Sequence, residues 1–265
     1  MATEAVLEFT ITDHPLQALI RPVLECGADE ALSELHKRHE NEKLPHEPPL
    51  CPTLQHAFRL GGRRLPGSWT ARHRNLGKRY SKLLSSEPYK RWLEGYDAFV
   101  RAVILPACGE GIYYQRPPTL RIAMPCAHKA TIGVHCDADY PGHTPGEINF
   151  WVPLVDVAES SALWLESSPG LGDFSARPLR VGQVLQFDGY RCRHHTQPNQ
   201  SGTTRVSFDL RCIPASALAA GEAPPSMIGD YPCVFMSCRD DAHAAPASSR
   251  VADSNEPLHE KNIAN

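Results

Sequence analysis

The sequence predicts a mainly β protein with flanking helices, closed as a double-sheet jelly roll. After Pro117 and Pro118, short segments of apolar or alternating residues follow one another, divided by Gly, Pro and Asn, which is typical of an antiparallel sandwich or barrel. Before them, apolar residues recur every three or four positions along 77–104, the period of an amphipathic helix. A chain with about eight such strands most readily forms two facing sheets, and the helix covers the outside of one of them.

A length of 265 residues and an apolar content of 42% suit one large domain or two small ones, and we favour a single domain over 1–238. Within it we expect an N-terminal helical part (1–117), a jelly-roll core (118–214) and a C-terminal segment (215–238). Residues 239–265 are rich in Ala, Ser, Asp, Glu and Asn, and they carry too little apolar surface to offset the entropy lost on ordering. We therefore expect a flexible tail there.

The overall charge argues against nucleic-acid and membrane partners. The formal net charge is -3 and the pI is near 6.5, so neither partner has an electrostatic reason to bind. No apolar run approaches the roughly 20 residues of a membrane span, and the acidic start lacks the pattern of a signal peptide. The cysteines are scattered singly without a C-x-x-C, which is typical of free thiols in a reducing compartment. We expect a soluble, cytoplasmic protein, whose oligomeric state no sequence pattern indicates.

The N-terminal part contains two charged segments. Residues 29–43 begin acidic, become basic and carry apolar residues at helical spacing, so we expect a surface helix. His36 and His39 lie in it among charges, which favours a solvated face over a metal site. The segment Arg59–Arg74 is rich in arginine and glycine. It is either a basic loop or a lid that meets an anionic substrate.

The pattern between Gly77 and Ile104 predicts helices that cover one side of the sheet. We expect a short helix over Lys78–Leu84 and a longer one with Pro88 in its first turn, where the missing N–H costs nothing. The apolar stripe of the longer helix consists of Tyr89, Trp92, Leu93, Tyr96, Phe99, Val100, Val103 and Ile104.

The β region predicts these strands: Leu120–Met124, Thr131–His135, Glu147–Leu154, Ala162–Glu166, Gln183–Phe187, Arg191–His195 and Thr203–Ile213. A last short segment, Ile228–Ser237, returns to the core. Side chains alternate along the strand at 203–213. One face carries Arg205, Ser207, Asp209 and Arg211, and the other carries Val206, Phe208, Leu210 and Cys212. We expect the polar face to line a cavity and the apolar face to pack under the helices.

His135 and Asp137 are separated by one residue near the end of a predicted strand. Because side chains alternate along an extended chain, the two point the same way and can bind one metal ion together. His194 or His195 can supply a third ligand once the chain folds back. Two imidazoles and one carboxylate form the facial triad of non-haem Fe(II) oxygenases, which leaves positions for substrate and oxygen. Asp139 is the alternative carboxylate.

Arg205 and Ser207 suit the cosubstrate of such an oxygenase. The reaction needs two electrons beyond those of the substrate, and 2-oxoglutarate supplies them by oxidative decarboxylation, so its distal carboxylate needs an anchor. Arg205 lies eleven residues after His194, and Ser207 shares its face of the strand. A guanidinium matches a carboxylate with two parallel hydrogen bonds, and the hydroxyl can add a third. The alternative is a surface strand with an incidental arginine.

Longer motifs around these residues resemble one known family. They are HCDADYPGHTPGEINFWVPL, ALWLESSPGLGDF, LRVGQVLQFDG and H-x4-N-x5-R-V-S-F-D-L-R-C-I-P, within about Leu120 to Pro214. They are similar to Fe(II)/2-oxoglutarate oxygenases of the streptomycin-biosynthesis type, which are related to the phytanoyl-CoA hydroxylase family. The resemblance implies a double-stranded β-helix with His135, Asp137 and a distal histidine as the metal ligands.

In this family an asparagine follows the distal histidine by five residues. Here that is Asn199, which selects His194 over His195. Where relatives typically carry H-G-N, this chain departs and has His194-His195-Thr196. The resemblance implies a dioxygenase that uses Fe(II), 2-oxoglutarate and O2, with ascorbate helpful in vitro, and releases succinate and CO2. Hydroxylation of a small polar metabolite (a sugar, cyclitol or amino-acid derivative) is the default reaction, and a protein or nucleic-acid substrate is less expected.

Further residues of the matched region are candidates for the pocket. Asn149 and Trp151 share one face of their predicted strand. Asn149 either bonds the 1-carboxylate of 2-oxoglutarate or has a structural role, and Trp151 is a candidate to meet substrate. Trp164 and Glu166 also share a face, on a strand that approaches the substrate in this family type.

Two charged residues have two interpretations each. Arg121 meets an anionic group of the substrate, or it forms an internal ion pair with Asp139, Glu147 or Asp209. His143, in the loop rich in Pro and Gly after the triad, either orders that loop or touches substrate.

Two other classes of protein share parts of this pattern. A metal-dependent cupin without a cosubstrate, such as an isomerase or thiol dioxygenase, has no need for Arg205 and Ser207. A non-catalytic, ligand-binding jelly roll needs neither His135 nor Asp137. The presence of both pairs in one chain favours the 2-oxoglutarate-dependent oxygenase.

Overall fold

The computed structural model of the chain describes its N-terminal segment and its β region. The described residues are 4–27, 29–39, 84–123, 125, 130, 132–218 and 223–238. The basic segment Arg59–Arg74, the short helix expected at 78–84 except for its last residue, and the expected tail at 239–265 lie outside them.

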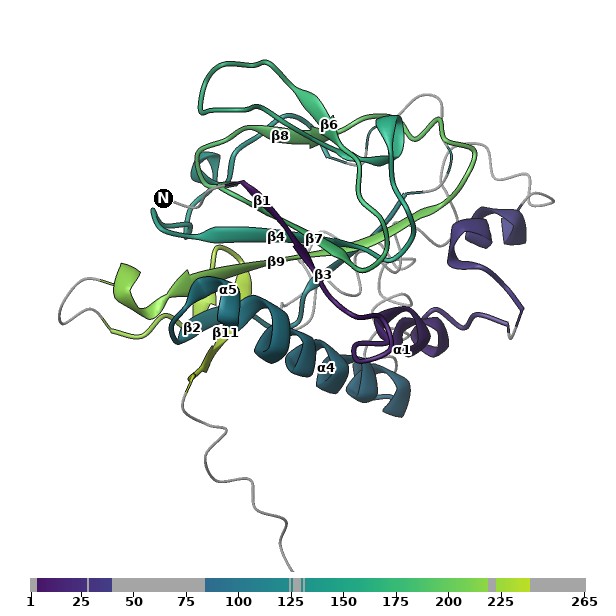
Figure 1. The fold of residues 1–265 in the computed structure, drawn as a ribbon, viewed down its shortest axis with the longest axis horizontal. Helices are drawn as coiled ribbons and strands as arrows, with labels where there is room; N and C mark the ends of the chain where they lie inside the picture. The colour runs from purple at the N-terminus through teal and green to yellow at the C-terminus, as the bar shows by residue number, and fades with distance from the viewer. Residues whose placement is uncertain are drawn as a thin grey trace, which may run out of the picture.

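The strands of the described chain form two sheets that face each other (Figure 1). The larger sheet contains β1 (Ala5–Glu8), β2 (Ile112–Gln115), β3 (Thr119–Ala123), β4 (Ile148–Pro153), β7 (Gln183–Phe187), β9 (Arg205–Pro214), β10 (Met227–Ile228) and β11 (Tyr231–Met236). The smaller sheet contains β5 (Leu163–Leu165), β6 (Ser175–Arg177) and β8 (His194–Thr196). The larger sheet runs β1-β7-β4-β9-β2-β11-β10, with β3 also paired to β9, and the smaller one runs β6-β5-β8. Neighbours pair antiparallel, which confirms the predicted mainly β jelly roll, a double-stranded β-helix.

Helices lie against the outer face of the larger sheet (Figure 1). They are α1 (Leu16–Val23), α4 (Glu87–Phe99) and α5 (Leu105–Cys108), and the π-helical turn Val100–Ile104 joins the last two. As predicted, Pro88 lies in the first turn of α4, and Ser86 caps that turn by accepting the backbone N–H of Tyr89 at 3.4 Å. Within the described ranges no helix combines the length and the apolar content that crossing a membrane requires.

The predicted alternation of β9 is confirmed on its helix side. Val206, Phe208, Leu210 and Cys212 are buried in the core beneath the helices. Three aromatic rings of α4 surround Phe208 edge-to-face, with centroid distances of 5.6 to 6.0 Å, a geometry that aromatic pairs prefer. These rings belong to Trp92, Tyr96 and Phe99. The polar residues of β9 consequently face the smaller sheet.

The structure corrects two predicted strands. Residues 132–135 form no strand, because only His135 pairs there, in an isolated bridge with His194. The strand predicted at Arg191–His195 begins only at His194. Asp188 holds a turn before it. Its backbone carbonyl accepts the N–H of Cys192 at 2.9 Å, and its Oδ1 accepts the N–H of Arg191 at 3.1 Å. Sequence reasoning also missed β1, β2 and β6.

The surface helix predicted at 29–43 is, within the described residues, a 3-10 helix at Leu32–His39. Thr204, which precedes β9, replaces part of its regular hydrogen bonding. The Oγ1 of Thr204 accepts the backbone N–H of His36 at 3.0 Å, and its own N–H donates to the carbonyl of Ser33 at 2.7 Å. Such contacts compete with the bonds of an α-helix.

Candidate metal centre

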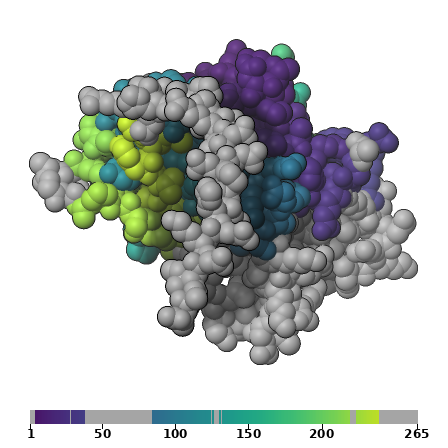
Figure 2. Space-filling model, turned by 90° about the horizontal axis from the view of Figure 1, so that it is seen from below, coloured from purple at the N-terminus to yellow at the C-terminus, as the bar shows by residue number. Residues whose placement is uncertain are grey.

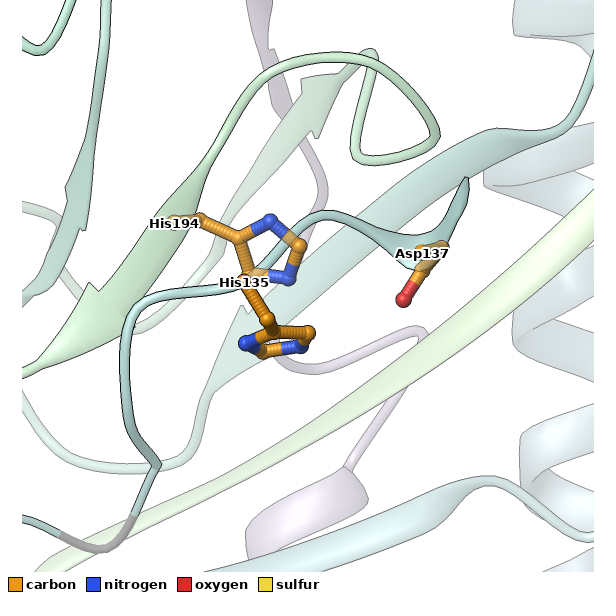
Figure 3. A group of neighbouring side chains, drawn as sticks. All are labelled: His135, Asp137 and His194. Carbon is orange, nitrogen blue, oxygen red and sulfur yellow. The ribbon is translucent and has the colours of Figure 1, made fainter. Parts of the chain in front are cut away.

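His135, Asp137 and His194 come together between the two sheets. Each offers a ligand atom, and these atoms all lie within 4.8 Å of one another. Figure 3 shows the side chains gathered around a shared space. His135 and His194 exchange two backbone hydrogen bonds of 3.2 and 2.8 Å, which sets their rings side by side with centroids 4.3 Å apart. Asp137 opens the short 3-10 turn Asp137–Asp139.

Both histidines leave the same ring nitrogen available. Nδ1 of His135 lies 2.9 Å from the carbonyl oxygen of Gly133, and Nδ1 of His194 lies 3.1 Å from that of Cys192. A carbonyl oxygen only accepts, so each Nδ1 carries the proton and each Nε2 keeps the lone pair that a metal ion needs. Burial and the neighbouring His135 lower the pKa of His194 to about 4, so this ring is neutral at neutral pH.

Asp137 is buried and is held by donors on both carboxylate oxygens. Arg211 donates from Nε to Oδ2 at 2.7 Å and from Nη2 to Oδ1 at 2.9 Å, and Asn149 donates from Nδ2 to Oδ2 at 2.7 Å. Burial acts to raise the pKa of Asp137, but Arg211 outweighs it and holds that pKa well below its usual range. Two of these donors use Oδ2 and one uses Oδ1, so Oδ1 keeps a lone pair for a metal ion.

Arg211 is the residue of this site whose role sequence reasoning missed. The alternation along β9 placed it on the polar face, but nothing local paired it with Asp137. The register does so, because Arg211 lies opposite Asn149 where β9 pairs with β4. Arg211 is buried, and its Nη1 also lies 3.4 Å from Oε1 of Gln115 and 3.5 Å from Oδ2 of Asp209.

The alternative ligands lie elsewhere. Asp139 is exposed, and it forms an ion pair of 3.0 Å with a neighbouring arginine. His195 points from the opposite face of β8, where its ring meets Phe174 edge-to-face at 4.9 Å. Of the open possibilities, the structure brings Asp137 and His194 to His135.

Arg205 and Ser207 lie deep on the inner face of β9. Arg205 is 1% exposed, and its Nη1 donates to the carbonyl of Ser161 at 3.3 Å. The Oγ of Ser207 is buried and has no hydrogen-bond partner among the described residues. Because a buried hydroxyl is normally bonded, a ligand with an acceptor oxygen suits this position. A buried arginine beside it favours a carboxylate ligand.

Asn149 and Arg121 both support the ligand Asp137. Of the two roles predicted for Asn149, the structure shows the structural one, since its amide donates to Asp137. Arg121 forms an ion pair with Asp209 in which Nη2 and Oδ2 are 3.1 Å apart. This is one of the internal ion pairs that the sequence left open. Asp209 also approaches Arg211, so Arg121 belongs to the same buried charge network.

Three further predicted substrate residues have packing or structural contacts. Trp151 packs in the apolar cluster between the sheets. Trp164 lies opposite His195 and not His194 in the pairing of β5 with β8, so it points away from the triad. The buried carboxylate of Glu166 accepts three backbone N–H groups at 2.6 to 3.1 Å, and it thereby braces the loop after β5. From the family resemblance we expected the strand of Trp164 and Glu166 to approach the substrate, and in the structure neither side chain is directed at the triad.

His143 orders the loop that follows the triad, which is one of its two predicted roles. Its Nδ1 lies 2.7 Å from Oε2 of Glu147, whose other oxygen accepts the backbone N–H of Thr144 at 2.6 Å. Ligand atoms of His143, Glu147 and Asp137 also lie within 4.8 Å of one another. Their bonds to one another and to Arg211 satisfy these groups, so they fit a loop brace better than a second metal site.

This chain is similar to streptomycin biosynthesis protein StrG of Streptomyces griseus. The two are 31% identical over 129 residues, which make up 46% of this chain and 60% of that protein. The chain thus spans 60% of the length of the curated relative that it matches. No family model matches the sequence.

Two solved structures resemble the fold more distantly. One is SnoK, a non-heme alpha ketoglutarate dependent carbocyclase from nogalamycin biosynthesis, with 13% identity, coverage of 64% of this chain and 90% of that chain, and a TM-score of 0.42. The other is the epimerase SnoN in complex with Fe3+, alpha ketoglutarate and nogalamycin RO, with 18% identity, coverage of 69% and 88%, and a TM-score of 0.34. At such identities and TM-scores, the likeness carries no conclusion about the activity of this chain.

Proposed function

We propose that the chain is a non-haem Fe(II)- and 2-oxoglutarate-dependent dioxygenase that hydroxylates a small polar metabolite. One observation carries the proposal: a group of two imidazoles and one carboxylate shares the space between the sheets with a buried arginine and a buried serine hydroxyl that has no partner in the described part of the chain. The first group suits Fe(II). The second suits the distal carboxylate of 2-oxoglutarate.

In this proposal His135 and His194 would hold Fe(II) through Nε2, and Asp137 would hold it through its carboxylate. When bound, Fe(II) and 2-oxoglutarate supply the oxidising power for the balanced reaction R–H + 2-oxoglutarate + O2 → R–OH + succinate + CO2. The carbonyls of Gly133 and Cys192 accept from Nδ1 and so hold both imidazoles in one orientation, as partners of metal-bound histidines generally do.

The chain also anchors the cosubstrate and limits the access of water. Arg205 and Ser207 are adjacent on one face of β9, so a carboxylate can accept from the guanidinium and the hydroxyl together. An apolar cluster fills part of the space between the sheets. It contains Trp151, Leu163, Leu165, Leu185 and Phe187. A dry surrounding of this kind strengthens the charge-assisted bonds of the site.

The similarity to StrG supports a small biosynthetic metabolite as the substrate. Within that class we expect a sugar, a cyclitol or an amino-acid derivative. No membrane or nucleic-acid partner is part of the proposal. Ascorbate is expected to help in vitro by keeping the iron reduced.

Succinate release tests the proposal against its two rivals. The purified chain is incubated with Fe(II), ascorbate, 2-oxoglutarate and a screen of polar metabolites, and succinate is measured. Release that requires both Fe(II) and 2-oxoglutarate, and that is lost in His194→Ala, supports the dioxygenase. Metal binding without 2-oxoglutarate binding would favour a metal-dependent cupin, and binding of neither would favour a non-catalytic jelly roll.

A further inference from the structure

The guanidinium of Arg211 meets two carboxylates and one aromatic ring. Along the edge it can reach two carboxylates, those of Asp137 and Asp209. Its Cζ also lies over the face of the Tyr231 ring, 5.5 Å from the ring centroid. An aromatic face attracts a cation, and more strongly where both groups are desolvated. The ring therefore restrains the position of the guanidinium, and this position decides which N–H groups meet which carboxylate.

Tyr231 belongs to a hairpin near the C-terminal end of the described chain. β10 and β11 are joined by a turn at Gly229, which has a φ of 55°. The N–H of Gly229 donates to the carbonyl of Gly142 at 2.8 Å, and the ring of His143 lies so close to Gly229 that an added Cβ would come within 2.2 Å of Nε2. The turn is thus seated against the loop that follows Asp137.

The hairpin is also tied to the larger sheet beside Arg211. β11 pairs with β2, and Cys233 lies opposite Gln115, whose side chain is another partner of Arg211. Figure 2 shows the C-terminal segment (yellow-green) on the same face of the molecule as part of the helical region (blue). The hairpin lies beyond the region Leu120 to Pro214 that carries the family resemblance.

We propose that Tyr231 is a positioning residue of the metal centre. It holds the guanidinium of Arg211 so that Nε and Nη2 face Asp137, and Asp137 is thereby kept in the position from which it would bind the metal ion. Without the ring, the guanidinium can turn toward Asp209, and its hydrogen bonds to Asp137 weaken. The C-terminal hairpin thereby helps to position a ligand of the metal centre. The inference rests on the proposed metal site.

Binding of Mn(II) to the full chain, followed by calorimetry or by the paramagnetic resonance of free Mn(II), tests the inference without turnover. Tyr231→Leu is expected to raise the Mn(II) Kd about 5- to 30-fold, because the cation over the ring loses its partner. Tyr231→Phe keeps the ring face, and its Kd is expected to stay within about twofold of the wild type. Tyr231→Met is the second variant for the case that leucine prevents folding, and it is expected to weaken binding as leucine does.

Phe235→Leu is the matched control on the same strand. Phe235 is 52% exposed, and its ring pairs with Tyr113 at 4.9 Å, so this change disturbs the hairpin without touching Arg211. We expect it to leave the Mn(II) Kd unchanged. Equal losses in Tyr231→Leu and Phe235→Leu, or wild-type binding in Tyr231→Leu and Tyr231→Met, would overturn the inference. A wild-type chain that binds no Mn(II), or binding that survives His135→Ala, would overturn the metal site itself.

Discussion

Gly189 lies directly against the side-chain amide of Asn149. A Cβ added to Gly189 would come within 2.5 Å of Nδ2 and within 2.7 Å of Oδ1 of Asn149. The carbonyl of Gly189 also accepts the backbone N–H of Asp137 at 2.8 Å. Asn149 in turn donates to Oδ2 of Asp137. Gly189 therefore supports the candidate ligand Asp137 in two ways: its carbonyl accepts the backbone N–H of Asp137, and its lack of a side chain leaves room for the amide of Asn149.

Gly189→Ala is therefore expected to weaken metal binding. The new methyl group displaces the amide of Asn149, and Asp137 loses one of its donors. Loss of such an outer partner typically costs about 10- to 100-fold in metal affinity, so we expect a Mn(II) Kd raised about tenfold or more. Combining Gly189→Ala with Asn149→Ala should add little, because both remove the same bond. Gly27→Ala, where an added Cβ meets nothing closer than 3.9 Å, is the control, and equal affinity in all these variants would contradict the argument.

Replacing His194 or its neighbour His195 distinguishes a metal ligand from a histidine that lies outside the metal site. His194→Ala should abolish Mn(II) binding and succinate release, because it removes one of three ligands from an open site. His195→Ala should be milder, since that ring lies on the outer face of β8. Calorimetric titration of both variants with Mn(II), with circular dichroism to check folding, makes the comparison. The reverse order of losses would refute the assignment of His194.

Arg205 should control the affinity for 2-oxoglutarate and have little effect on that for metal. Removing a charge-assisted contact from a closed site costs roughly 2–5 kcal/mol, so Arg205→Ala should raise the 2-oxoglutarate Kd by about 30-fold or more. Arg205→Lys should rescue only part, because an ammonium lacks the planar fork. Titration of the Mn(II)-loaded chain with 2-oxoglutarate measures this effect. An unchanged Kd in Arg205→Ala would move the anchor to another arginine of the inner face.

His194 makes the metal-free protein sensitive to acid. Its pKa falls from an ordinary 6.5 to about 4 on folding, through burial and the nearby His135. Between these values the unfolded chain takes up a proton that the folded one does not, so stability is complete above pH 6.5 and is lost as the pH falls toward 4. The full loss is roughly 3 kcal/mol. Urea unfolding at several pH values in the presence of a chelator should show this decline, and it should be smaller in His194→Gln. Identical pH profiles for the two chains would exclude this contribution.

Short-range patterns were enough to predict much of the fold and part of the site. The alternation along β9 placed Phe208 under the helices and Arg205 on the opposite face, because side-chain direction in a strand depends only on position along it. The stripe of α4 followed in the same way from a period of three to four residues. The spacing of His135 and Asp137 likewise required no knowledge of the rest of the chain.

The tertiary structure decided what depends on the pairing of distant segments. Arg211 and Asp137 are 74 residues apart, and only the register of β4 with β9 brings them together. Trp164 turns away from the triad because it lies opposite His195 and not His194. A one-residue shift of register would reverse both faces of a strand. Register reflects packing summed over the whole sheet. No local run of residues could therefore reveal that Arg211 pairs with Asp137 or that Arg211 lies over the ring of Tyr231.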